Sequence, residues 1–242
     1  SLVLPGGEVE TVDALDVEHP EEWSEERVCF HGISEGQDQL VEAFHPRGTL
    51  EGWLAGVAPL QDYPRALIVL YASFAAPLLA VLNVPNFIVD LAHDTTVGKT
   101  TALRAAASAW GNPDERTACS AVLTWDASRV GLERSSEVIS HLPLCIDDTA
   151  KARSKKAVAD LIYAVVSGRG RTRGTPGGLA RTPVWRTVMI STGEQSATSF
   201  TQDGGTRTRV LSLEGFPFGG SSLDLSKLTT KMSRELCQHY GH

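Results

Sequence analysis

The chain has 242 residues, of which 42% are hydrophobic, and a formal net charge of −7. This length allows one large domain or two small ones, and the hydrophobic content is that of an ordinary globular protein. Its four cysteines are scattered and form no CxxC pair. A zinc site and a disulfide framework are therefore not expected, and a reducing, cytoplasmic location fits this cysteine usage.

The charge is unevenly distributed along the chain. Residues 1–60 hold 13 acidic and 2 basic side chains, a balance of −11, whereas residues 151–210 hold 11 basic and 3 acidic ones, a balance of +8. We expect the basic region to meet phosphate groups; a solvated basic face, or arginines directed at a neighbouring subunit's nucleotide, are the alternatives. We divide the chain into an acidic N-terminal segment (1–60), a core (61–220) and a C-terminal helix (221–242).

The first part of the chain predicts helices and one long apolar segment. Residues 1–27 read as a loop or a weakly held extension, and 28–30 as a short strand. Apolar spacing predicts a helix over 35–44 that continues over 49–57, followed by a turn between Pro59 and Pro64. Residues 66–82 are apolar and 17 residues long, the short limit for a membrane span. We expect a buried helix there and no membrane association.

From Phe87 onward, predicted strands alternate with predicted helices. A strand leads into a loop and a helix that ends near Trp110, where Gly111, Asn112 and Pro113 stop it. Further strands are predicted over 120–125, 142–146, 184–190 and 208–213, and helices over 128–139 and 152–167. This alternation predicts an α/β fold with a mostly parallel sheet and helices on both faces.

Residues 93–101, HDTTVGKTT, have the character of a phosphate-binding P-loop because they lie between a strand and a helix. In such a loop Lys99 reaches the β- and γ-phosphates of ATP, and Thr100 holds Mg²⁺. Backbone N–H groups of the loop and of the helix start face the phosphates. His93 replaces the usual first glycine, and a chance GKT is the alternative. The predicted nucleotide-binding residues are His93, Asp94, Thr95, Thr96, Val97, Gly98, Lys99, Thr100 and Thr101.

A second motif, LPLCIDD, follows about 50 residues downstream at 142–148. A buried strand that ends in carboxylates is typical of a Walker B segment, so Asp147 is predicted to hold Mg²⁺ and Asp148 to orient the attacking water. Aspartate is one methylene shorter than the glutamate common there, which favours slow catalysis. Ser191 or Thr192, at the end of a later strand, is predicted to sense the γ-phosphate; an ordinary polar turn is the alternative.

Two groups of arginines follow. Arg207 and Arg209 flank Thr208 before the last strand, and either is a candidate arginine finger for a neighbour's ATP. Arg169, Arg171 and Arg173 alternate with Gly and Thr, so they would share one face of an extended hairpin. Such a hairpin predicts a DNA contact or a contact between subunits.

These segments together resemble the DUF927 family of domains of unknown function, which is found in helicase-like proteins of phages and mobile elements and is related to minichromosome-maintenance-type AAA+ ATPases. The resemblance implies an AAA+-like P-loop core, a homo-oligomeric hexameric ring or filament, and ATP-driven work on DNA. By position it favours Arg209 over Arg207 as the finger. It also implies that the protein continues beyond residue 242. The matching segments are 98–111, 124–133, 142–148, 161–173, 185–194 and 208–213.

Three functions from different classes follow from these observations. The first is a Mg-ATP-dependent AAA+ motor on DNA, in which Lys99, Asp148, Thr192 and Arg209 are catalytic. The second is an ATP-binding switch or assembly module with little hydrolysis, because His93 and Asp148 depart from the family pattern. The third is a nucleotide or small-molecule kinase, although the sequence has no recognisable lid.

Overall fold

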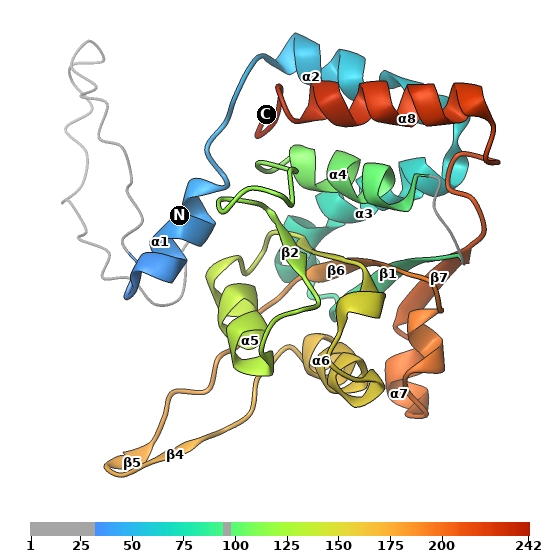
Figure 1. Cartoon of the computed structure of the whole chain (residues 1–242). Helices are drawn as coiled ribbons and strands as arrows, with labels where there is room; N and C mark the ends of the chain where they lie inside the picture. The colour runs from blue at the N-terminus through green and yellow to red at the C-terminus, as the bar shows by residue number, and fades with distance from the viewer. Residues whose placement is uncertain (1–31, 94–97) are drawn as a thin grey trace, which may run out of the picture.

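The computed structural model describes residues 32–93 and 98–242, and its centre is a five-stranded sheet of order β2-β3-β6-β1-β7 (Figure 1). Every neighbouring pair in this sheet is parallel. The predicted α/β fold with a mostly parallel sheet is therefore confirmed. The strands are β1 (Phe87–Ala92), β2 (Val122–Thr124), β3 (Leu144–Asp147), β6 (Val188–Gly193) and β7 (Val210–Glu214), with β4 (Gly174–Thr175) and β5 (Gly178–Leu179) in a separate hairpin.

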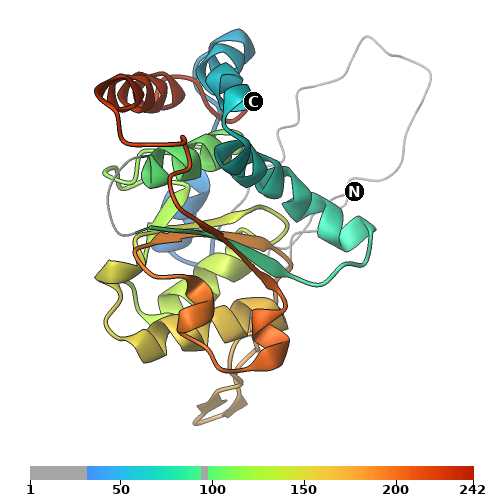
Figure 2. The same ribbon diagram turned by 90° about the vertical axis from the view of Figure 1, so that its right-hand side faces the viewer.

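Helices cover both faces of the sheet, as Figure 2 shows edge-on. On one face α3 and α4 lie against the sheet and α2 and α8 pack outside them, and on the other face lie α5, α6 and the short α7. The helices are α1 (Glu35–Glu42), α2 (Leu50–Val57), α3 (Pro64–Val81), α4 (Lys99–Ser108), α5 (Arg129–Val138), α6 (Lys155–Ser167), α7 (Gly204–Arg207) and α8 (Leu223–Leu236), with single turns η1 (Ala58–Asp62), η2 (Thr149–Lys151) and η3 (Ala197–Ser199).

The strands divide their side chains between two hydrophobic cores because successive residues of a strand point to opposite faces. Val89 and Ile190 lie in the core beneath α3 and α4. Ile88, Met189 and Ile146 lie in the core beneath α5 and α6. The three central strands, β1, β3 and β6, are buried on both faces, which explains the apolar runs in their sequences, whereas the edge strands β2 and β7 are partly exposed.

Most predicted elements from residue 58 onward are confirmed, and two predictions need correction. The predicted continuous helix over 35–57 is two helices, since residues between α1 and α2 include Pro46 and Gly48, the latter with a φ of 80°. The predicted strand at 184–190 begins only at Val188, because Trp185 donates its backbone N–H to the Gly168 carbonyl at 3.0 Å and closes the hairpin instead. The predictions for 1–27 and 28–30 lie outside the described residues.

The long apolar segment forms α3, which packs against α4 and the sheet. Among the described residues it is the one helix long and apolar enough to cross a bilayer, a test of length and composition that core helices also pass. Its buried side includes Ala66, Val69 and Ala76, while Tyr71 and Val81 are exposed. The expectation of a packed helix is confirmed for that inner side.

The C-terminal helix α8 lies beside α2 and α4 (Figure 1). The Thr49 backbone N–H donates to His239 Nδ1 at 3.0 Å, and the hydroxyls of Thr101 and Ser233 lie 3.1 Å apart. Residues on both sides of the predicted boundaries at 60 and 220 therefore contact one another, and the division into three parts stays a prediction.

Candidate functional site

The loop between β1 and α4 is braced at both ends by the segment after β7. Its last residue, Gly98, has a φ of 96°, and a Cβ there would lie 2.4 Å from the buried ring of Phe218. Only glycine combines this left-handed conformation with such a close approach. At the other end, the His93 ring meets the Phe216 ring edge-on, with centroids 4.2 Å apart. The predicted ligands Asp94, Thr95, Thr96 and Val97 lie outside the described residues.

Lys99 begins α4 directly after this glycine, and its Nζ donates a hydrogen bond to the His93 carbonyl. This hydrogen bond connects the two described ends of the loop, His93 and the start of α4. The N-terminus of α4 adds unpaired backbone N–H groups and the positive end of the helix dipole. Such a combination of a lysine and a helix N-terminus at the carboxyl edge of a sheet is chemically suited to binding an anion.

Asp147 ends β3 at the same edge and is 6% exposed. Its Oδ1 accepts hydrogen bonds from two hydroxyls, Thr100 at 3.2 Å and Thr192 at 2.8 Å. The three side chains come from α4, β3 and β6. The fold thus brings together Thr100 and Thr192, which are 92 positions apart in the sequence. The predicted P-loop and Walker B residues therefore meet in space.

Asp148 follows with a φ of 60°, a conformation that side-chain-bearing residues seldom adopt. Its backbone N–H donates to Thr192 Oγ1 at 2.9 Å, and its carboxylate accepts from the Ala150 N–H at 3.1 Å. The carboxylate is partly exposed, at 37%. Thr192 therefore links both aspartates and fixes the turn that carries Asp148.

The structure distinguishes between the two candidates on β6. Thr192 faces α4 and the aspartates, whereas Ser191 faces the opposite core and accepts a hydrogen bond from Trp125 Nε1 at 3.1 Å. The difference follows from strand alternation. Of the two candidates, Thr192 is therefore the one that lies at the sheet edge beside Asp147 and Asp148.

Lys151 is a site residue that the sequence reasoning missed. Its Nζ lies 3.5 Å from Asp147 Oδ2 and 3.8 Å from Asp148 Oδ2. The sequence did offer a sign of this contact, because Lys151 follows Asp147 by four residues and Asp148 by three. Because Lys151 is half exposed, this contact is a weak ion pair that a competing cation can displace.

The donor set of this edge fits magnesium. The described residues contain no cluster of three or more His, Cys, Asp or Glu side chains that could form an all-protein metal cage. Mg²⁺ in nucleotide sites needs less, one or two protein oxygens together with phosphate and water oxygens. Thr100 and Asp147 supply such oxygens side by side.

Two hollows flank this edge. One, of about 580 Å³, lies between the start of α4 and α8 and is lined by Gly98, Thr100, Thr101, Thr229 and Ser233 among others. The second, of about 460 Å³, lies on the far side of Asp147 and Lys151, next to β2. The site is therefore open on both sides of the Thr100–Asp147 pair.

A buried carboxylate lies within the sheet, on β1. Asp90, in the middle of β1, has no exposed surface, and its Oδ2 accepts from the Ala197 N–H at 2.7 Å and the Ser212 hydroxyl at 3.3 Å. Its Oδ1 has no hydrogen-bond partner among the described residues. Burial raises the pKa of the Asp90 carboxyl to about 6, although these hydrogen bonds and the Lys99 charge oppose the rise.

The candidate arginine fingers lie away from the site. The Arg209 carbonyl accepts from the Ile88 N–H, near the start of β1, and β7 begins at the next residue. Arg209 is thus at the amino edge of the sheet, opposite Lys99, and both it and Arg207 are exposed. Neither reaches the site of its own chain.

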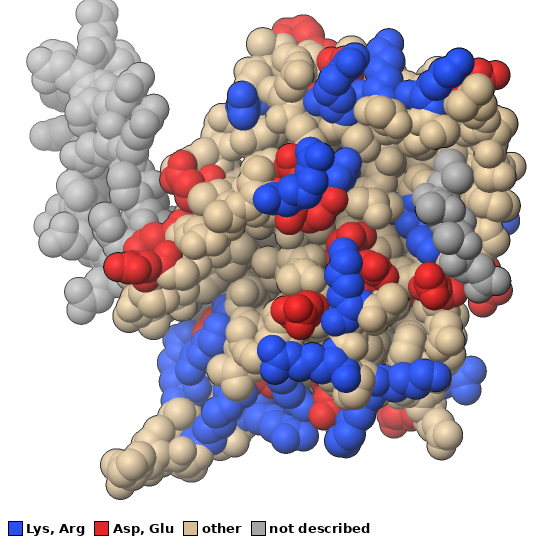
Figure 3. Space-filling model, viewed as in Figure 1, with Lys and Arg blue, Asp and Glu red and all other residues tan. Residues whose placement is uncertain are grey.

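Arg169, Arg171 and Arg173 lie on the first arm of a hairpin that projects from the body (Figure 1). Lysines and arginines gather at its base and along the neighbouring α6, while its tip carries no charge (Figure 3). The three arginines differ in environment, since Arg173 binds the buried Glu133 at 2.5 Å and Arg171 lies 3.9 Å from Asp160.

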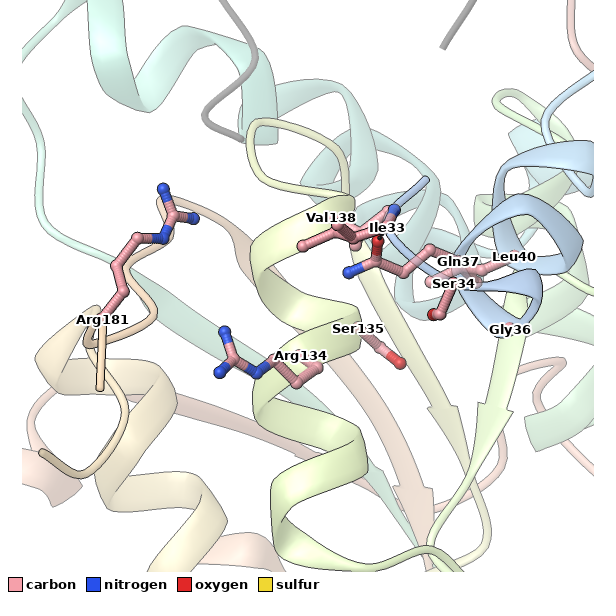
Figure 4. A pocket seen from close by; sticks show the side chains of 9 residues that line it. All are labelled: Ile33, Ser34, Gly36, Gln37, Leu40, Arg134, Ser135, Val138 and Arg181. Atoms are coloured by element: carbon pink, nitrogen blue, oxygen red, sulfur yellow. Dashed lines mark hydrogen bonds between the residues drawn. The ribbon is translucent and has the colours of Figure 1, made fainter. Parts of the chain in front are cut away.

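A further cavity of about 570 Å³ lies between α1 and α5, with Ile33 and Leu40 on one wall (Figure 4). Arg134 and Arg181 reach its other wall. Both arginines share the one carboxylate of Glu137, so this wall of the cavity keeps a net positive charge.

A family model and two solved structures are similar to this chain. The family model described as "Domain of unknown function (DUF927)" matches residues 22–185. No curated protein matches the sequence. The solved structure of the SCCmec type IV protein Cch, described as an active helicase, matches with a TM-score of 0.62 at 21% identity, covering 82% of this chain and 36% of that one.

A second solved structure is that of JCV helicase with a bound small molecule. It matches with a TM-score of 0.44 at 17% identity, covering 85% of this chain and 60% of that one. The chain therefore spans about a third of the length of Cch and three fifths of that of JCV helicase.

Proposed function

The chain belongs to the DUF927 family of domains of unknown function, and from this membership and the geometry of the sheet edge we propose that it is the AAA+-type P-loop ATPase core of a Mg-ATP-dependent motor that acts on DNA. The observation that carries the proposal is the convergence of Lys99, Thr100, Asp147 and Thr192 at the carboxyl edge of one parallel sheet. Ligands of open α/β sheets bind at this edge.

The residues have distinct roles in this proposal. Lys99 leaves the His93 carbonyl to bind the β- and γ-phosphates, and Thr100 and Asp147 hold the magnesium that neutralises their charge. Asp148 accepts a hydrogen bond from the attacking water and orients it. Thr192 keeps Asp148 in place and contacts the γ-phosphate.

Arg209 supports an assembled enzyme. It lies at the sheet edge opposite the loop of its own chain, so it would act on the nucleotide of a neighbouring copy. An arginine that stabilises the transition state from the neighbour makes hydrolysis depend on a homo-oligomer, either a hexameric ring or a filament.

The projecting basic hairpin is the proposed DNA contact. Arg169 and Arg171 are exposed on its first arm, and exposed lysines lie on the adjacent start of α6. Such a surface binds the phosphate backbone without reading sequence. The similarity to a solved helicase of the same fold favours a helicase-like motor of a phage or mobile element, working in the cytoplasm, with residues 61–220 as its core.

An ATP-binding switch with little hydrolysis is the second candidate. It is favoured by the shorter carboxylate of Asp148 and by Lys151, which lies against both aspartates. In this case nucleotide binding would change assembly without sustained turnover.

Steady-state ATP hydrolysis with and without single-stranded DNA tests both candidates. The Lys99→Ala protein serves as the test variant and Lys227→Ala, which removes an exposed lysine of α8, as its matched control. DNA-stimulated turnover that is lost in Lys99→Ala and kept in Lys227→Ala supports the motor. ATP binding without turnover supports the switch, and equal ATP affinity in all three proteins refutes the site.

A further inference from the structure

The hairpin between α6 and β6 is long and closed at its base. Arg169 pairs with Val184, and the Gly170 N–H donates to the Pro183 carbonyl at 2.9 Å. The two arms continue to the short strands β4 and β5 at the tip. In Figures 1 and 2 the tip extends well beyond the helices, so something must fix its direction at the base.

Two buried glutamates of α5 bind the two arms. Glu133 has no exposed surface and Glu137 is 4% exposed. They are four residues apart and therefore share one face of the helix. Glu133 accepts from Arg173 of the first arm at 2.5 Å, and Glu137 accepts from Arg181 of the second arm.

Each glutamate is also bound within α5. Arg129 donates to Glu133 at 2.7 Å, and Arg134 donates to Glu137 at 3.0 Å. Burial tends to raise the pKa of Glu133, but the hydrogen bonds and charges of Arg129 and Arg173 bring the pKa below its usual value. Glu133 is consequently ionised at neutral pH, and removing one of its partners would leave a buried charge poorly compensated.

At its base the hairpin also packs closely against α5, in addition to its ion pairs with that helix. A Cβ on Gly170 would lie 2.9 Å from Glu133 Oε2 and 2.7 Å from Pro183 Cγ. The first arm therefore approaches Glu133 as closely as a glycine backbone allows. A methyl group at this position would push the arm away without changing any charge.

We propose that Glu133 and Glu137 are positioning residues that clamp the two arms of the hairpin to α5, so that Arg173 and Arg181 hold the hairpin instead of binding nucleic acid. The nucleic-acid contact then falls on the arginines outside the clamp, Arg169 and Arg171, and on the uncharged tip. This inference rests on the proposed function for its nucleic-acid partner, and the clamp itself is testable without DNA.

For a variant in which one of the two glutamates is neutralised, the clamp predicts a change in DNA affinity opposite to the change that surface charge alone predicts. If the glutamates merely reduce the positive potential, neutralising one of them strengthens DNA binding. If they position the hairpin, the same change weakens DNA binding although the protein becomes more positive. Asp160→Asn is the matched control. Asp160 is not buried and lies 3.9 Å from Arg171 and 3.1 Å from Arg129, but the clamp arginines Arg173 and Arg181 pair with Glu133 and Glu137 instead.

The experiment compares wild type, Glu133→Gln, Gly170→Ala and Asp160→Asn. Native-state trypsin cleavage after Arg171 and Arg173 measures attachment of the hairpin, and fluorescence anisotropy with a labelled single-stranded oligonucleotide measures DNA binding. Loss of a charged hydrogen bond in Glu133→Gln, and displacement of the first arm in Gly170→Ala, predict cleavage about tenfold faster, with Asp160→Asn like wild type. Gly170→Ala, which keeps every charge, serves if Glu133→Gln does not fold.

The two readouts separate failure of the clamp from failure of the proposed function. Faster cleavage with weaker DNA binding in both clamp variants, and tighter binding in Asp160→Asn, supports the inference. Unchanged cleavage, or tighter DNA binding in Glu133→Gln as in Asp160→Asn, overturns it. If wild type does not bind the oligonucleotide, the DNA function is wrong, and cleavage still decides the clamp.

Discussion

The buried carboxyl of Asp90 makes the stability of this fold depend on pH in an unusual direction. Its pKa is raised from 3.8 to about 6 in the native state by burial, so the native state holds this proton more tightly than the unfolded chain does. The stabilising contribution of Asp90 to the free energy of unfolding is therefore fully present below about pH 4 and is lost as pH rises through about 6. The complete loss is about 3 kcal/mol at 1.36 kcal/mol per pKa unit.

Replacing the carboxyl with an amide removes this titration. Between about pH 4.5 and about pH 7.5 we expect the unfolding free energy of wild type to fall by about 2 kcal/mol relative to that of Asp90→Asn. Urea unfolding followed by tryptophan fluorescence at several pH values measures the difference. Asp126→Asn, which alters a carboxyl that is 68% exposed, is the control and should follow wild type.

The comparison with Asp90→Asn is needed because other carboxyls act in the opposite sense. The pKa of Asp114 is lowered by its hydrogen bond with Arg116, and that of Glu133 is lowered by its arginines against the effect of burial, so both stabilise the fold above their unfolded pKa and not below it. These effects cancel in the difference between the two proteins. Parallel curves for wild type and Asp90→Asn would show that Asp90 is not held in an apolar environment.

Three other predictions concern the nucleotide site. Thr192→Val removes the hydroxyl that joins the two aspartates, so kcat for ATP hydrolysis should fall about tenfold or more with little change in KM. Ser191→Ala, the control, should change stability and leave kcat near wild type. Equal kcat values in the two variants would contradict the placement of Thr192 at the site. Gly98→Ala should lose ATP binding and about 2 kcal/mol or more of stability, because its Cβ meets Phe218 at a positive φ, and an unchanged melting temperature would refute the packing argument. Arg209→Ala by itself should have no ATPase activity, but it should regain part of that activity when mixed with Lys99→Ala. In the mixed oligomer Arg209→Ala supplies Lys99 and Lys99→Ala supplies Arg209, so some sites contain both residues. No recovery in a confirmed mixed oligomer would argue against action on a neighbour.

The sequence by itself determined the order of elements and the chemistry of their ends. The apolar runs at β1 and β3 predict buried strands, and the motifs that follow them, the GKT and the aspartate pair, are local in the chain. Residue type within the motif also permits part of its backbone conformation, as at the left-handed Gly98. These parts were therefore predictable without knowledge of the fold.

Only the tertiary structure decided which of these groups meet. Ser191 and Thr192 are equivalent in sequence, and their roles separate only because α4 covers one face of the sheet and α5 and α6 the other. The environment of Arg173 depends on Glu133, 40 residues away. Charge and burial of this kind arise from long-range packing, which no local pattern of residues encodes.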